Sequence, residues 1–153
     1  MPTLFHKMIG CFLAASFLGV TAHANLPSDA YTGYWAMTEP VLGSYVVVNF
    51  RKTGSSIIST QYQFSCNEDG SFLQTGAVPS TLSPSAGGLL VYEHGDSRPA
   101  SELSVLGFIP NEGLILQQKF TERLSGLQSV FPEGMVFAYA YTPILRPLCD
   151  LEE

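Results

Sequence analysis

Hydrophobic and polar residues alternate with a period of two along much of the chain after residue 30. This period is typical of β-strands that bury one face, because successive side chains of a strand point to opposite sides. The alternation is clearest from Ile57 to Cys66, where every second residue builds an apolar face: Ile58, Thr60, Tyr62, Phe64 and Cys66. We therefore expect Cys66 to point toward the apolar side of its strand.

Eight segments have strand character, and turns rich in glycine and proline separate them. In chain order they are Tyr31 to Thr38, Ser44 to Phe50, Ile57 to Cys66, Ser71 to Val78, Leu89 to Glu93, Glu102 to Ile109, Leu114 to Thr121 and Met135 to Thr142. Asp69-Gly70 predicts a hairpin turn. Pro79 to Gly88 predicts a mobile loop. The helical signal is limited to about one turn, carried by Leu124, Leu127 and Phe131.

The order of these segments predicts the fold class. Long helical crossovers do not separate the strands, so a parallel βαβ architecture is disfavoured. We expect an all-β protein, a single antiparallel up-and-down barrel of about eight strands, with a sandwich as the alternative. Closure removes exposed sheet edges, and successive hairpin turns favour a simple meander.

The first 24 residues have the composition of a secretory signal peptide. His6 and Lys7 form a weakly basic start, Met8 to Val20 is apolar, and Ala22-His23-Ala24 is a small-x-small cleavage site. The apolar run is shorter than the roughly 20 residues of a transmembrane helix. We expect cleavage after Ala24, a single β-barrel domain over residues 25–153 without an integral membrane segment, and a periplasmic or secreted location.

Secretion changes the interpretation of the cysteines. Cleavage removes Cys11 and leaves Cys66 and Cys149. Two cysteines in an oxidising compartment most simply form one disulfide bond. A metal site or a redox pair has less support, because the chain lacks Cys-x-x-Cys spacing and the mature part contains one histidine, His94.

The charge distribution excludes some partners. The formal net charge is −6, and it becomes −7 when Lys7 leaves with the signal peptide. The remaining lysines and arginines are few and scattered, which argues against a nucleic-acid surface and against an anionic membrane surface. The acidic residues indicate either simple solubility or an acidic face for a basic partner.

Candidate catalytic groups are scarce. His94 and Asp96 lie in one predicted loop, and no Gly-x-Ser-x-Gly motif accompanies them. Glu93-His94-Gly95-Asp96 offers metal ligands from one place only, so a polar hairpin end is the favoured interpretation. We expect a non-enzymatic protein without cofactor or metal.

Aromatic residues in the predicted strands are a better indication of function. They either fill the interior of a small barrel or line an apolar pocket at an open end. Tyr62, Tyr139 and Tyr141 are the candidate ligand-binding residues.

Gly33-Tyr34-Trp35, on the first predicted strand, resembles the Gly-x-Trp motif of the lipocalins and related calycin barrels. In that family the tryptophan plugs one end of the barrel, and an arginine after the last strand packs across it; Arg146 lies at the matching place. A disulfide from the C-terminal segment to an early strand, as Cys66 and Cys149 would form, is also similar to lipocalins. The resemblance implies a barrel that holds a small ligand, with Trp35 and Arg146 as a structural pair.

Two functions of different classes follow. The first is a periplasmic or secreted binding protein that holds a small apolar or amphipathic ligand. The alternative is a periplasmic inhibitor or immunity protein that blocks another protein through acidic loops, including Pro79 to Gly88 and His94 to Ser101. An open apolar cavity favours the first function, whereas a filled core with an acidic loop cluster favours the second.

Overall fold

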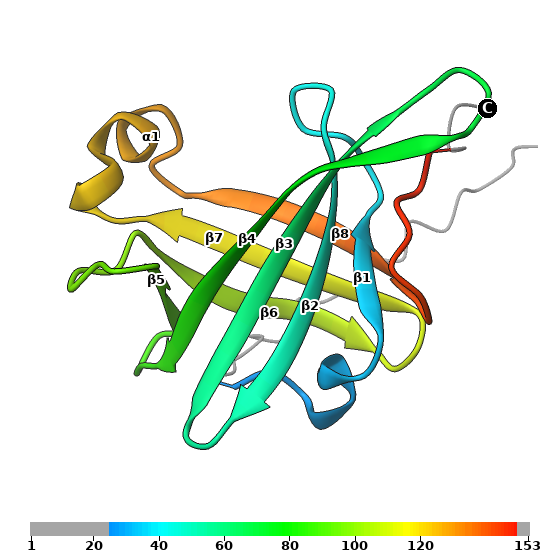
Figure 1. The fold of residues 1–153 in the computed structure, drawn as a ribbon. Coiled ribbons are helices and arrows are strands. Elements are labelled where there is room, and N and C mark those ends of the chain that lie inside the picture. The colour runs from blue at the N-terminus through cyan, green and yellow to red at the C-terminus, as the bar shows by residue number, and fades with distance from the viewer. Residues whose placement is uncertain (1–24, 150–153) are drawn as a thin grey trace, which may run out of the picture.

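The computed structural model describes residues 25–149, so the predicted signal peptide lies outside the described residues. Eight antiparallel strands form one sheet that closes into a barrel (Figure 1). The strands are β1 (Tyr34–Met37), β2 (Tyr45–Thr53), β3 (Ser56–Cys66), β4 (Phe72–Pro84), β5 (Leu89–Glu93), β6 (Ser101–Ile109), β7 (Gly113–Phe120) and β8 (Met135–Thr142). The helical segments are η1 (Ser28–Tyr31), η2 (Glu122–Leu124) and α1 (Ser125–Val130). The all-β class and the antiparallel barrel are confirmed.

Each strand pairs with the next one along the chain, and β1 pairs with β8 to close the ring. Trp35 lies opposite Tyr141, and Ala36 lies opposite Ala140 at this closure. Short turns join β2 to β3, β4 to β5 and β6 to β7, and such hairpin turns place antiparallel neighbours side by side. None of the helices in residues 25–149 is long and apolar enough to cross a membrane.

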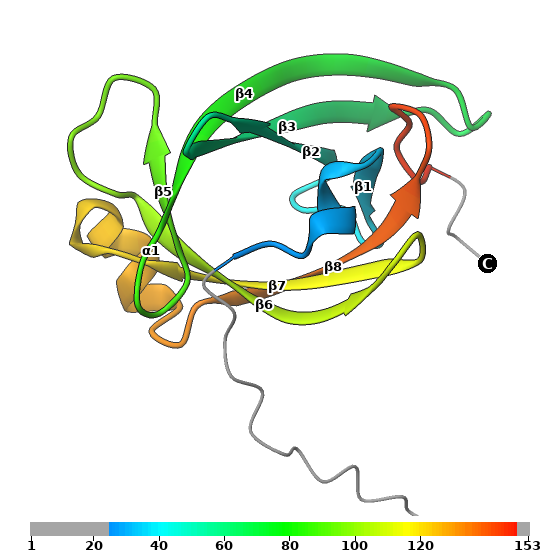
Figure 2. The same cartoon turned by 90° about the horizontal axis from the view of Figure 1, so that it is seen from below.

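The barrel interior is filled near η1. Five large side chains are completely buried there or close by: Trp35, Phe50, Leu82, Leu89 and Leu114. The Trp35 indole Nε1–H donates a hydrogen bond to the Ala30 carbonyl oxygen at 2.8 Å, which ties η1 to β1. Figure 2 shows η1 lying across this end of the ring. We call it the closed end.

A second, smaller apolar cluster lies on the other face of the sheet. Ala36, Val47 and Phe64 are its buried members, and Leu145 and Leu148 of the C-terminal segment pack against them. These residues are separate from the inner cluster, to which their strand neighbours Trp35 and Val48 belong. The C-terminal segment therefore covers the outer surface of β1, β2 and β3.

This outer cluster shows on which side of the barrel the apolar face of β3 lies. The face that contains Tyr62, Phe64 and Cys66 is the outside of the barrel. Ile57 belongs to the inner cluster, so Ser59, Gln61 and Gln63 share the inner face by alternation. Apolarity alone did not distinguish the two faces, because the C-terminal segment gives this sheet a second buried surface.

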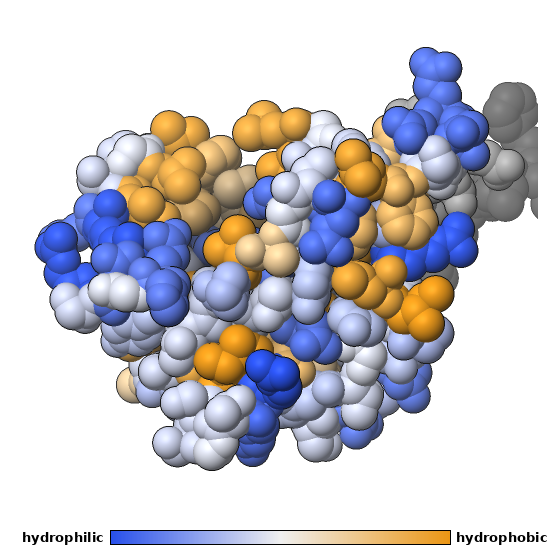
Figure 3. Space-filling view, in the orientation of Figure 1, coloured by the Kyte–Doolittle hydropathy of each residue, from blue (hydrophilic) through white to orange (hydrophobic). Residues whose placement is uncertain are grey.

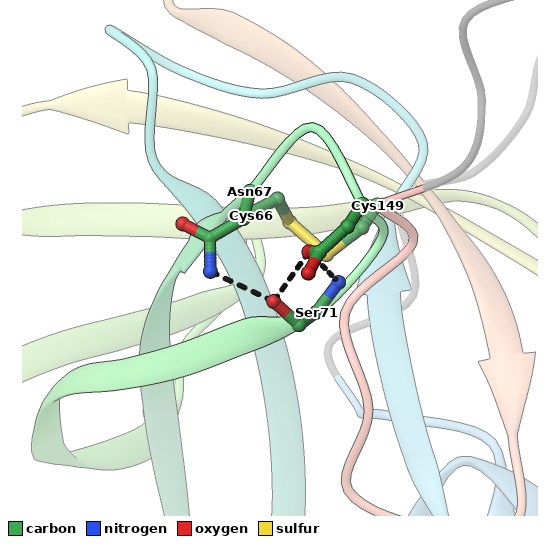
Figure 4. The surroundings of a disulfide bond; sticks show 5 residues. Cys66, Asn67, Ser71 and Cys149 are labelled. Atoms are coloured by element: carbon green, nitrogen blue, oxygen red, sulfur yellow. Dashed lines mark hydrogen bonds between the residues drawn. A yellow bond between two sulfur atoms is a disulfide. The ribbon is translucent and has the colours of Figure 1, made fainter.

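The predicted disulfide between Cys66 and Cys149 is confirmed, and it attaches the C-terminal segment to the end of β3 (Figure 4). The two Cα atoms are 5.5 Å apart. The adjoining turn is held by Asp69, whose carboxylate accepts hydrogen bonds from the Ser71 hydroxyl at 2.5 Å and the Ser71 N–H at 2.9 Å. These bonds from Ser71 lower the pKa of Asp69.

The prediction of a mobile loop over Pro79 to Gly88 was wrong. β4 continues as a strand to Pro84, and the turn to β5 is short, with the Ser85 N–H donating to the Gly88 carbonyl at 2.8 Å. That bond implies that the odd-numbered residues of β4 from Ala77 onward point their backbone groups toward the β5 side. Pro79 lies just past the last β4–β5 pair, Ser80 with Glu93, so its missing N–H costs no ladder hydrogen bond.

Candidate functional site

Four connections meet at the end of the barrel opposite η1, which we call the open end. They are residues 38–44, 67–71, 94–100 and 121–134. Seven carboxylates lie in them or beside them: Glu39, Glu68, Asp69, Glu93, Asp96, Glu122 and Glu133. Arg98, Lys119 and Arg123 carry the positive charges of this region. Figure 3 shows hydrophobic side chains exposed here as well, over α1 and the β1–β2 loop.

Inward-facing side chains differ in burial along the barrel. Val46, Val91, Leu103 and Phe137 pack against the inner cluster but are only partly buried, and the same holds for Phe108 and Tyr141 near the closed end. Polar groups join them on the inner face: Ser101 is completely buried, and its hydroxyl accepts a hydrogen bond from the Gln118 Nε2–H at 2.9 Å. The inner face therefore combines apolar side chains with a hydrogen-bonded polar pair from β6 and β7.

A groove of about 270 Å³ opens at this end between the β1–β2 loop and the start of β8. Its lining consists of residues 37–41 and 135–138. Met37, Val41 and Phe137 belong to the inner cluster or pack against it, so the groove borders the barrel interior. We call it the rim groove.

One wall of the rim groove carries backbone groups of Val136 without a strand partner in the described part of the chain. The Thr38 N–H donates to the Ala138 carbonyl at 3.0 Å, so even-numbered residues of β8 point their backbone groups toward β1. Paired residues of β1 and β8 end at Met37 and Tyr139. Continuing the register places Pro40, which has no N–H, opposite Val136. The seam between the two strands consequently opens at Val136.

The three candidate tyrosines do not share one place. Tyr139 and Tyr141 lie with the inner cluster, whereas Tyr62 packs with the outer cluster, its ring 6.3 Å from that of Tyr34. Tyr141 contacts Trp35, with ring centroids 5.4 Å apart, and so belongs to the filled part of the barrel. Of the three, Tyr139 lies nearest to the rim groove in the register, opposite Met37.

Tyr139 is 7% exposed. Burial raises its pKa well above the ordinary value of a phenol, because the charged phenolate loses its hydration. The hydroxyl is protonated at neutral pH, as an ordinary phenol already is, and it can donate a hydrogen bond. No hydrogen bond of this hydroxyl to another described residue is present.

The proposed structural pair occupies two different surroundings. Trp35 is completely buried, between Tyr141 and Phe108. Arg146 is exposed and belongs to the segment that covers the outer cluster, between Leu145 and Pro147. A contribution of Arg146 to closing the barrel therefore stays a prediction.

The carboxylates on either side of His94 form ion pairs with Arg123, which hold this loop in place. Arg123, before α1, binds Glu93 at 2.8 Å and also Asp96 through the same nitrogen, so it connects the β5–β6 and β7–β8 connections. A shallow second groove of about 220 Å³ adjoins Arg98 and Arg123. In residues 25–149 no group of three or more His, Cys, Asp or Glu side chains is placed to hold a metal ion.

Sequence reasoning missed the rim groove. Met37, Val41 and Phe137 resemble ordinary strand residues in the sequence, and the usable signal was Pro40, which stops β1 from extending along β8. No family model matches the chain, and neither the curated proteins nor the solved structures gave a match.

Proposed function

We propose that the protein is a secreted or periplasmic, non-enzymatic binding protein of the lipocalin-like kind, which holds a small, largely apolar ligand at the open end of its barrel. The observation that carries the proposal is the rim groove. Its volume of about 270 Å³ is near the lower limit of typical small-molecule sites, which are concave and mostly apolar with a few placed polar groups.

The groove supplies both kinds of contact. Met37, Val41 and Phe137 provide apolar surface that continues into the inner cluster. The N–H and C=O of Val136 provide a fixed donor and acceptor. Tyr139 directly follows Ala138, the last residue of β8 that lines the groove. A flat ligand with one hydrogen-bonding group satisfies this arrangement, because burying apolar area stabilises the complex and the polar group orients it.

The proposal is tested with a neutral two-ring fluorescent probe, N-phenyl-1-naphthylamine, titrated into the mature protein. We expect saturable binding with a rise in fluorescence. Ala138 is an exposed residue in the lining of the groove, so Ala138→Phe places a bulky ring there and should abolish the fluorescence signal. Ala86→Phe adds the same side chain to the exposed turn between β4 and β5 and should bind like the wild type. Equal binding by both variants would refute the assignment.

A second function, inhibition of a basic protein, is favoured by one separate observation. The carboxylates of the open end outnumber its basic residues, and they lie in all four connections. Such a distribution accelerates encounter with a positively charged partner and is screened by salt. Probe binding that survives high salt supports the first function, whereas a copurified basic polypeptide released by salt supports the second.

A further inference from the structure

The β3–β4 hairpin extends beyond the rest of the barrel as an arm (Figure 1). β4 spans Phe72–Pro84, but it pairs with β5 only from Ser80 onward. Residues 72–79 consequently have β3 on one side and no strand on the other in the described part of the chain. We call residues 72–78 the arm edge. A sheet edge of this length is a template for another strand.

Two hydrogen bonds show which residues of the arm edge direct their backbone outward. The Ser85–Gly88 turn bond places Ala77 among the residues that point away from β3. Near the hairpin turn, the Asn67 N–H donates to the Ser71 carbonyl at 2.8 Å, so Ser71 and Leu73 point toward β3, and Gln74 points outward. The outward residues are odd-numbered on one side of the register shift opposite Gln63 and Phe64 and even-numbered on the other, because β4 has one extra residue there. Ala77 and Gln74 thus present free N–H and C=O groups.

The arm edge is uncharged and carries accessible apolar side chains beside Gln74 and Thr75. Leu73 is 65% exposed and Val78 is 47% exposed, and both lie on the inner face, because they pair with Ser65 and Gln61 of β3. No charged residue occurs from Ser71 to Tyr92. Natural edges are usually protected by lysines, prolines or bulges; here Pro79 and the register shift limit the edge, and no charge interrupts it.

We propose that the arm edge pairs with the arm edge of a second copy of this chain, forming an antiparallel two-strand contact about a twofold axis. The outward-facing residues dictate one register, in which Gln74 lies opposite Ala77 of the other copy and exchanges two backbone hydrogen bonds with it. The same register places Leu73 opposite Val78, on the same face. Twofold symmetry repeats both pairs, so each of the exposed apolar side chains gains an apolar neighbour.

A second copy fits this edge better than a charged partner does. Each chain carries a negative net charge, so self-association needs a surface where like charges do not meet. The arm edge is such a surface, since its own residues are neutral.

Sedimentation velocity of the mature protein, from micromolar to millimolar concentration, tests the proposal. We expect a reversible monomer–dimer equilibrium. Ala77→Pro removes an outward N–H without breaking a β3–β4 hydrogen bond, and should leave a folded monomer. Val136→Pro is the matched control, since it removes an N–H that faces the rim groove, and it should dimerise like the wild type.

Circular dichroism melts of both proline variants establish that they fold. A wild type that stays monomeric throughout, or a dimer that persists in folded Ala77→Pro, overturns the proposal. The wild type could instead carry a tightly bound foreign polypeptide that folded Ala77→Pro lacks. That result would also overturn the proposal, because it would assign the edge to another protein. If Ala77→Pro does not fold, Gln74→Pro, at the other outward position, decides between the same outcomes.

Discussion

Replacing Cys66 and Cys149 together by serine is expected to destabilise the barrel without changing its fold. The bond joins residues 83 positions apart. In the chain-entropy account a loop of that length contributes about 4.5 kcal/mol, because the reduced unfolded chain gains freedom that the crosslink denies it. For a domain of this size each kcal/mol corresponds to about 3 °C, so the loss in Tm should approach about 14 °C.

The structure adds a local consequence. Without the bond, Leu145 and Leu148 are held over Ala36, Val47 and Phe64 by apolar contact alone, so the outer cluster should open before the inner one. Hydrogen exchange should therefore increase first in β3 near Phe64 and in the C-terminal segment, and remain slow around Trp35.

Thermal melts followed by circular dichroism, with and without a reductant, measure the effect. The wild type should lose stability on reduction, and the double variant should be indifferent to the reductant. A double variant that melts within about 2 °C of the oxidised wild type would refute the reasoning, since it would show that the crosslink restrains neither the unfolded chain nor the C-terminal segment.

Other changes have equally definite outcomes. Trp35→Ala should cost about 3–5 kcal/mol in urea unfolding, because a completely buried ring and its bond to Ala30 are lost. Gly33→Ala should cost about 2 kcal/mol, since Gly33 has φ +70° and a Cβ would lie 2.6 Å from Tyr141 Cε2; full stability would contradict this. Arg123→Met should cost less than about 1 kcal/mol, because its carboxylate partners are 48% and 39% exposed; a loss above about 2 kcal/mol would contradict the surface character of the pair. Burial raises the pKa of Tyr139, so its contribution to stability should be complete below about pH 10, the unfolded value, and fall as the pH rises above it; Tyr139→Phe should reduce this decline in a series of urea melts, and Tyr31, whose pKa burial also raises, should retain part of it.

The strands were predictable because their signals are local. Alternation and turn residues located all eight, and Leu89–Glu93 and Met135–Thr142 were predicted with their observed bounds. The error at Pro79 had a physical cause: a proline is compatible with a strand wherever its nitrogen faces an unpaired edge, and only the register shows which way it faces.

The candidate site was less predictable than the fold. Tyr139 and Tyr62 both occupy apolar faces of strands, but the segment 143–149 covers the face of Tyr62 and converts it into an outer cluster. Period-two patterning assigns residues to one of two faces and does not say which face is inside. The rim groove depends on where β1 stops relative to β8, a property of two segments that are about a hundred residues apart in the chain.

The measurement that tests the central claim most directly is native mass spectrometry of the protein purified from its own source, beside Ala138→Phe prepared in the same way. A bound ligand in the rim groove predicts a wild-type mass that exceeds the denatured mass by a few hundred daltons, and a variant without that excess. Equal native and denatured masses in the wild type, or an excess that Ala138→Phe retains, would contradict the claim that this groove is the binding site.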